Sequence, residues 1–117
     1  MVEITKTSRD FDKVETYLMT IAPGITSLKD VPDGTSITVS GTIKFNDVKE
    51  ITGEVTEIVS IITPDKKVYS AQSKTVKRSL SDIEKIMDGE QFAIIKTSGL
   101  TKAGRTFINV ELDTSKL

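Results

Sequence analysis

The fold is decided by one stretch of alternating sequence, Thr35-Ser36-Ile37-Thr38-Val39-Ser40-Gly41-Thr42-Ile43-Lys44-Phe45. Its apolar side chains recur at every second position, which is the period of a β-strand and the clearest strand pattern in the chain. We expect Gly41 and the apolar residues on one side and the polar residues on the other. Because Gly41 has no side chain to pack, it is typical of a bulge or of a sharp bend where a sheet curls. The pattern predicts one long, bent strand.

A hairpin is predicted immediately downstream, after a polar connection over residues 46–52. Residues 54–62 are strongly apolar, which favours a buried strand with an irregularity. Pro64 stands at the second position of a turn over residues 63–66, as in a type I turn. The second arm of the hairpin is expected over residues 67–76, where neither face is decisively apolar.

A short helix of about two turns is predicted over residues 81–88. Ser81 and Glu84 have the spacing of a capping box, and Gly89 is placed for a left-handed stop. Four apolar residues are expected on its buried face: Leu80, Ile83, Ile86 and Met87.

Two more strands complete the pattern, over residues 91–97 and 106–112, with a loop over residues 98–105 between them. In the last strand one face is apolar and carries Ile108, Val110 and Leu112. The other face carries Phe107, Asn109 and Glu111.

An amphipathic helix is predicted before the main body. Its five apolar residues recur at spacings of three and four and should form one buried face: Phe11, Val14, Tyr17, Leu18 and Ile21. Thr7, Ser8 or Asp10 can cap its start, and Pro23-Gly24 ends it. Whether this helix caps the main body or makes a dimer contact stays open.

The predicted order is therefore three strands, a helix and two strands, after an N-terminal helical arm. That is the order of the OB-fold, a five-stranded barrel in which ligands lie across the second and third strands, between the first and last hairpin loops. We expect a mainly β, single domain over residues 1–117, with the arm over 1–30 and the barrel over 31–113. The rival is an α+β meander with the helices on one open five-stranded sheet.

The composition excludes several function classes. The chain has neither Cys nor His, so disulfides, thiolate nucleophiles, Cys-type metal sites and the usual general base near neutral pH are missing. We expect no enzyme activity, no cofactor and no metal. No apolar leader or run of about 20 apolar residues is present, so we expect a cytoplasmic protein, in the host cytoplasm if a phage encodes it.

Cations gather in two later segments, although the formal net charge is only −1. The predicted third strand and its end carry Lys66, Lys67, Lys74, Lys77 and Arg78 without an acid among them. The last hairpin carries Lys96, Lys102 and Arg105, and Lys44 lies on the first strand. Such cations can neutralise phosphates and release counterions, whereas the alternative for each is an ordinary solvated edge or a flexible loop.

Only six aromatic residues are available for stacking on bases. Phe11, Tyr17, Phe45 and Phe92 lie on apolar faces and are expected in the core. Tyr69 lies among small residues on the lysine-rich strand, and Phe107 points away from the apolar face of the last strand. Either can stack a base, although Phe107 can equally pack under the arm or across a subunit contact.

The element order, the basic third strand and the hairpin Thr101-Lys102-Ala103-Gly104-Arg105-Thr106-Phe107 resemble the small OB-fold single-stranded DNA-binding proteins of bacteriophages that infect Gram-positive bacteria. The resemblance covers roughly residues 31–112. Cellular bacterial relatives carry tryptophans on the binding face and an acidic tail tip, both of which this sequence lacks. The resemblance therefore implies weaker stacking, supported by Tyr69, Phe107 and the lysines.

We therefore predict a protein that coats single-stranded DNA without sequence preference in replication or recombination. We expect a homo-oligomer, a dimer or tetramer, with replication or recombination proteins as further partners and no membrane. The alternative is a non-catalytic OB-like module for protein interaction or structure. A carboxylate-and-metal nuclease ranks third, since the acidic pairs Asp10/Asp12, Asp47/Glu50 and Glu54/Glu57 have no supporting structure.

Overall fold

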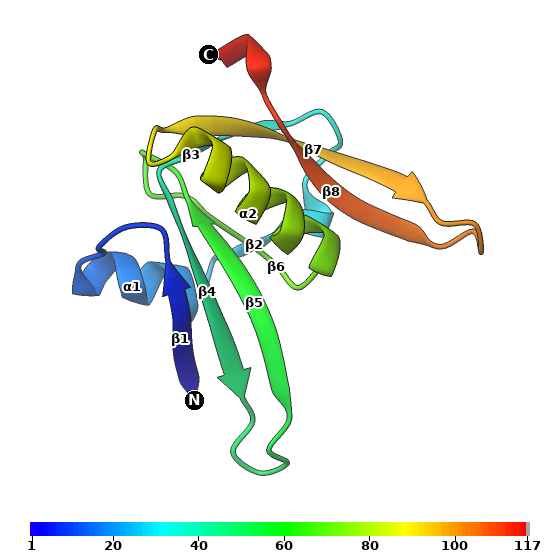
Figure 1. The fold of residues 1–117 in the computed structure, drawn as a ribbon. Helices are drawn as coiled ribbons and strands as arrows, with labels where there is room; N and C mark the ends of the chain where they lie inside the picture. The colour runs from blue at the N-terminus through cyan, green and yellow to red at the C-terminus, as the bar shows by residue number, and fades with distance from the viewer. Residues whose placement is uncertain (117) are drawn as a thin grey trace.

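The computed structural model describes residues 1–116, and it is mainly β with two helices (Figure 1). Five strands form one sheet in the order β1 (Val2–Thr7), β4 (Gly41–Val48), β5 (Val55–Ile62), β6 (Val68–Ala71) and β2 (Thr26–Ser27). A second sheet has the order β3 (Ser36–Val39), β7 (Phe92–Leu100) and β8 (Thr106–Leu112). All neighbours are antiparallel except β2 and β6. The remaining elements are the helices α1 (Lys13–Thr20), α2 (Lys74–Met87) and two short 3-10 turns, Leu28–Asp30 and Thr114–Lys116.

The predicted bend lies at Ser40 and Gly41, where the long first strand passes from β3 in one sheet to β4 in the other. Strands that switch sheets make the corner of a two-sheet fold. The expectation of one apolar face along the whole strand is wrong. Ile37 and Val39 belong to one core cluster, whereas Ile43 and Phe45 belong to another, because the corner turns the side chains after it to the opposite side.

The larger core lies between the two sheets and is covered by α2. It joins residues of five strands, the helix and the connection before β3: Leu28, Val31, Ile37, Val39, Val59, Ile61, Ala71, Val76, Leu80, Ile83, Phe92, Ile94 and Val110. The predicted apolar face of the last strand is confirmed, since Ile108 and Leu112 also pack against this core.

Helix α2 starts earlier and is longer than the sequence predicts. Ser73 caps it by accepting a hydrogen bond from the Val76 backbone N–H (3.2 Å), so the predicted capping box at Ser81 is wrong. The second arm of the hairpin consequently ends at β6, and residues 74–76 are helical. The stop is close to the predicted one, with Asp88 in the left-handed conformation. Ile86 faces solvent instead of the core, while Leu80 and Ile83 are buried as expected.

The smaller core covers the other face of the five-stranded sheet, under α1. It contains Met19, Ile43, Phe45, Ile62 and Val68, with Phe11, Leu18, Ile25 and Ile58 packed against it. The helices therefore lie on opposite faces of this sheet. The rival with a single open sheet is wrong, because the strands of residues 1–116 form two sheets.

The N-terminal segment differs most from expectation. Residues 2–7 form β1 at the edge of the sheet, paired with β4, and α1 starts only at Lys13. Its cap is Asp12 with Glu15 in a capping box, instead of Thr7, Ser8 or Asp10. The helix buries Glu15 and Met19, whereas the predicted face exposes Val14, Tyr17 and Ile21. The prediction is confirmed for Phe11 and Leu18, which pack against the smaller core, and is wrong for the other three residues, because the helix turns Met19 toward the sheet.

The order of elements is compatible with an OB-like fold: β3 and β4 as one bent strand, then β5, β6, α2, β7 and β8. Within residues 1–116, β6 and β8 are not hydrogen-bonded neighbours, so the two sheets stay open between them. Over the same residues no helix combines the length and apolar character that crossing a membrane requires.

Candidate nucleic-acid interface

A groove of about 440 Å³ lies where β6 and β8 fail to pair. The two long hairpins, β4–β5 and β7–β8, diverge on this side of the molecule, and the first turn of α2 lies between them (Figure 1). The groove is lined by residues from β5, β6, β8 and the start of α2, with two from the segment around β2: Ser27, Lys29, Ile58, Ser70, Ala71, Gln72, Ser73, Thr106, Phe107 and Ile108. This is the side on which the open edges leave room for a ligand.

Phe107 supplies the aromatic surface of the groove. It pairs across the hairpin with Gly99, and its ring lies directly over this glycine, since a Cβ added there would stand 2.8 Å from the ring's Cζ. Phe107 is 38% exposed. The missing side chain at Gly99 thus holds a flat, accessible ring at the groove, as base stacking requires.

Five exposed cations lie in the groove lining or on the segments next to it. Lys29 lines it, Lys74 follows the lining residue Ser73, and Arg78 lies one helical turn later. Lys102 and Arg105 are in the turn that precedes Thr106. Across residues 1–116, none of the five has a carboxylate within 4.0 Å. Their charges are free to meet phosphates.

The first turn of α2 adds a further electrostatic feature. It has no acidic residue and carries Lys74 and Lys77, although a helix N-terminus favours anions. Cations at this position cost stability in the free protein, and an anion bound nearby removes that cost. The N-terminus of α2 is therefore suited to a phosphate.

Two of the predicted site lysines are buried instead. Lys77 is 9% exposed and donates to the Glu57 carbonyl (2.7 Å), with the Glu57 carboxylate at 3.5 Å. Lys96 is 5% exposed and its Nζ lies 2.8 Å from Asp33. Hydrogen bonds from Lys96 and Ser98 hold the pKa of Asp33 below its usual range. Both lysines tie elements of the protein together and do not reach the groove surface.

Lys66 and Lys67 lie in the β5–β6 turn, at the end of this hairpin away from the groove, and Tyr69 is in β6, close after the turn. Lys66 contacts Glu15 (2.9 Å) and Lys67 contacts Asp65 (3.9 Å). Tyr69 is half-buried and packs against the larger core. Lys44 lies apart from both groups. It is on β4 opposite Val59, so its side chain is on the sheet face that the larger core covers. The structure therefore divides the predicted site into separate groups.

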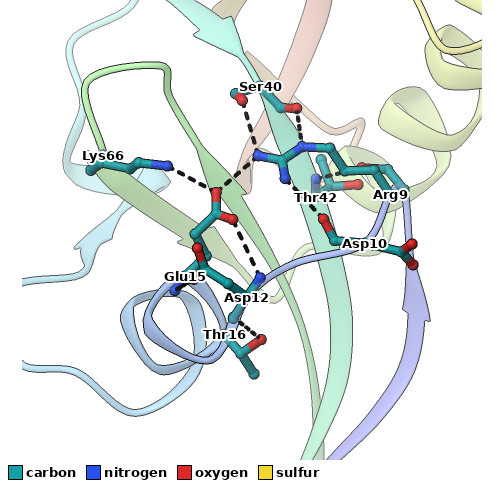
Figure 2. A network of polar contacts seen from close by, with 9 residues as sticks. Arg9, Asp10, Asp12, Glu15, Thr16, Ser40, Thr42 and Lys66 are labelled. Carbon is teal, nitrogen blue, oxygen red and sulfur yellow. Dashed lines mark hydrogen bonds and ion pairs between the residues drawn. The ribbon is translucent and has the colours of Figure 1, made fainter.

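Glu15 is the centre of a polar network on this far side (Figure 2). It is 7% exposed and accepts from Arg9 (3.0 Å) and Lys66 (2.9 Å). The hydrogen bond from Arg9, followed by that from Lys66, lowers the pKa of Glu15 to about 2. Arg9 also donates to the Ser40 carbonyl and hydroxyl, at 3.0 and 3.1 Å. One carboxylate thus joins the α1 region to the β3–β4 corner and the β5–β6 turn, and it occupies two cations.

Sequence reasoning missed Lys29 and the polar side chains of Ser70 and Gln72. The sequence places Lys29 in the predicted helical arm, and only the pairing of β2 with β6 brings it to the groove. No spacing in the sequence signals this contact, because Ser27 and Ser70 meet only in the folded sheet.

The comparisons with known proteins identify the family of the chain. The family described as "Phage Single-stranded DNA-binding protein" matches residues 5–113. The single-stranded DNA-binding proteins of Bacillus phages PZA and phi29 are each 30% identical over 91 residues, covering 74% of this chain and 73% of theirs. No solved structure matches the chain with statistical support. The chain, with its open groove, free cations and accessible ring, belongs to the family of phage single-stranded DNA-binding proteins.

Proposed function

We propose that the chain coats single-stranded DNA without sequence preference during phage DNA replication, and that the DNA lies in the groove between β6 and β8. The observation that carries this placement is the set of five exposed cations, without carboxylate partners among residues 1–116, in or next to the segments that line the groove with Phe107. Lys29, Lys74, Arg78, Lys102 and Arg105 neutralise phosphates. Phe107 stacks on a base.

This arrangement favours a single strand over a duplex. A base can stack on Phe107 only if one of its faces is open, and in a duplex both faces are covered by neighbouring base pairs. Lysine and arginine contacts to phosphate carry no sequence information, so binding is expected to tolerate any sequence.

We place the groove in the framework of an OB barrel over residues 31–113, open between β6 and β8. Such barrels bind between their first and last hairpin loops, here residues 49–54 and 101–105. Lys66, Lys67 and Tyr69 extend the DNA path beyond the groove with a smaller share of the binding energy. Lys77 and Lys96 act on the fold and not on DNA, and Lys44 lies away from the groove lining. One OB domain covers about 4–16 nucleotides, so a homo-oligomer gains affinity through avidity.

The test is fluorescence anisotropy of labelled oligo-dT of about thirty bases, against the same label on duplex DNA, over a salt series. We expect binding to the single strand alone. Five phosphate contacts predict a slope of about −3.5 for log K against log salt, at about −0.7 per contact on single strands. Equal binding to duplex, or no binding at low salt, would contradict the proposal.

A further inference from the structure

The two walls of the DNA groove are not joined to each other by strand pairing. On one wall, β6 pairs with β5 only as far as Val59 and Ala71, so the part of β5 before Val59 has no strand neighbour on this side within residues 1–116. On the other wall, β8 pairs with β7 alone over the same residues. The spacing of the walls therefore depends on α2, which lies between the two hairpins (Figure 1).

Two side chains of α2 reach one wall each. The Nζ of Lys77 donates to the carbonyl of Glu57 on β5 (2.7 Å), at a position that β6 does not reach. The hydroxyl of Ser79 donates to Oδ1 of Asn109 on β8 (2.6 Å). Glu57 and Asn109 are each next in sequence to a residue that lines the groove. The helix is thus hydrogen-bonded to both walls close to the groove itself.

Helix geometry places a DNA-binding cation between these two contacts. Successive residues of an α-helix are about 100° apart, so Lys77 and Ser79 are about 200° apart and point to nearly opposite sides. Arg78 lies between them and is exposed. Lys74, four residues earlier, is on the same side of the helix as Arg78. The two hydrogen bonds therefore fix the orientation of the helix side that carries two proposed phosphate contacts.

The contact with Asn109 also fixes the aromatic ring. Asn109 follows Phe107 by two residues in β8, so both side chains are on the same side of that strand. The hydrogen bond from Ser79 consequently joins the strand segment that carries the ring to the helix that carries Lys74 and Arg78. A base and the phosphates of one DNA strand are covalently linked, so they can be bound together only if ring and cations keep a matching separation.

We propose that Lys77 and Ser79 are positioning residues for DNA binding. Neither contacts the DNA. Together they set the spacing of the two walls, and Ser79 in particular sets the position of Phe107 relative to the cations of α2. Binding groups depend on such supporting hydrogen bonds, because a site that is about 1 Å too loose loses much of its activity. The inference rests on the function proposed above and adds two residues to that site.

The first experiment is a double-mutant cycle on the affinity for oligo-dT of about eight bases. Because the hydroxyl acts through the ring, Ser79→Ala should weaken binding about fivefold in the parent and less than about twofold in the Phe107→Ala background. Ser79→Thr keeps the hydroxyl and should bind like the parent. The matched control is Ser81→Ala, since Ser81 is on the same helix and makes no side-chain hydrogen bond among residues 1–116. Equal losses in the two backgrounds, or no loss in the parent, would overturn the role of Ser79.

Lys77→Met separates positioning from direct contact. A lysine that neutralises a phosphate reduces the slope of log K against log salt by about 0.7 when it is removed. For a positioning lysine we expect weaker binding with an unchanged slope. A slope reduced by one full contact would make Lys77 a DNA ligand and contradict the proposal.

The second experiment measures the spacing of the walls without DNA. Since the chain has no cysteine, Ile51→Cys and Ala103→Cys place spin labels only in the exposed turns of the two hairpins. Pulsed dipolar spectroscopy should give a narrow distance distribution for this labelled chain and a broader or displaced one after Lys77→Met with Ser79→Ala. Circular dichroism should be unchanged, because the core burial of α2 does not depend on these two side chains.

The outcomes separate the two proposals. If the parent binds single-stranded DNA but the distance distribution and the cycle show no effect, only the positioning role fails. If the parent does not bind DNA, the proposed function fails, and the distance distribution still decides whether Lys77 and Ser79 hold the walls. An unchanged distribution in the double variant would overturn the inference in either case.

Discussion

The groove side and the α1 side of the molecule contain the same kinds of basic residue in opposite electrostatic states. Around the groove, Lys74, Arg78 and Arg105 are exposed and have no carboxylate within 4.0 Å anywhere in residues 1–116. On the α1 side, Arg9 and Lys66 share the carboxylate of Glu15. A count of basic residues in a sequence therefore overstates the charge available to DNA, and the pairing of each cation decides where a phosphate can bind.

The aromatic residues show the same contrast. Phe107 is held over Gly99 at the edge of the groove, whereas Tyr69 packs against the larger core. Nearby lysines in the sequence therefore do not show whether an aromatic ring is accessible for stacking, whereas the position of the ring in the structure does.

The largest difference between the two sides is expected when cations are removed from each in matched pairs. We expect Lys74→Ala with Arg78→Ala to weaken single-stranded DNA binding about 100-fold, because two charge-assisted contacts are lost at about 1.5 kcal/mol each. The pair Lys66→Ala with Lys67→Ala should weaken it by less than about threefold, since exposed paired cations contribute little. Anisotropy at one salt concentration measures both. The reverse order of effects would place the DNA on the α1 side.

The aromatic comparison predicts the next largest effect. Phe107→Ala should reduce affinity about tenfold, because a stacked base contributes about 1–3 kcal/mol. Its control is Tyr17→Ala, which removes an exposed ring from the other side and should leave binding to a short oligonucleotide unchanged. Equal losses for the two variants would remove Phe107 from the site.

Gly99→Ala tests whether the position of the Phe107 ring matters for binding, without removing the ring. A Cβ at this position would lie 2.8 Å from Cζ of Phe107, so the ring must move, while the fold is expected to persist because the ring is at the end of a side chain. We expect a several-fold loss of affinity that does not exceed the loss in Phe107→Ala. Leu100→Ala, on the exposed neighbour in the same hairpin, is the control and should bind normally. A Gly99→Ala variant with full affinity would show that ring position is unimportant.

The smallest effect on DNA is expected from Glu15→Gln, which instead changes stability. The folded protein lowers the pKa of Glu15 from 4.5 to about 2, so its contribution is present above pH 4.5 and is lost as the pH falls toward 2. The variant should have a lower Tm at pH 7, and the difference should shrink across this window in thermal unfolding followed by circular dichroism. DNA affinity should stay equal or rise slightly, since Arg9 and Lys66 are released. A Tm difference that does not change with pH would contradict this role.

The strand and turn framework could be predicted because it depends on local periodicity. The alternation over residues 35–45 and the turn at Pro64 were both recognisable. The start of α2 was not, since Ser81 with Glu84 has the better capping sequence, while the burial of Val76 and Leu80 extends the helix back to Ser73. Packing with residues distant in sequence outweighed the local signal.

The candidate site was less predictable, because pairing of charges joins distant positions. Lys66 and Glu15 are 51 residues apart, and Lys96 and Asp33 are 63 apart. No spacing rule distinguishes these lysines from the free Lys102. Exposure in a hairpin turn is no guide either, because Lys66 and Lys102 both lie in such turns and only Lys66 contacts a carboxylate among residues 1–116.

The most direct test of the account is a titration of the isotope-labelled protein with a short oligo-dT, followed by amide chemical shifts in NMR spectra. If the free cations define the site, the largest shifts fall on residues 70–74, 78 and 102–108 and on Lys29, while the amides around Glu15 and Lys66 change little. Shifts concentrated on the α1 side, with the groove unchanged, would contradict the account.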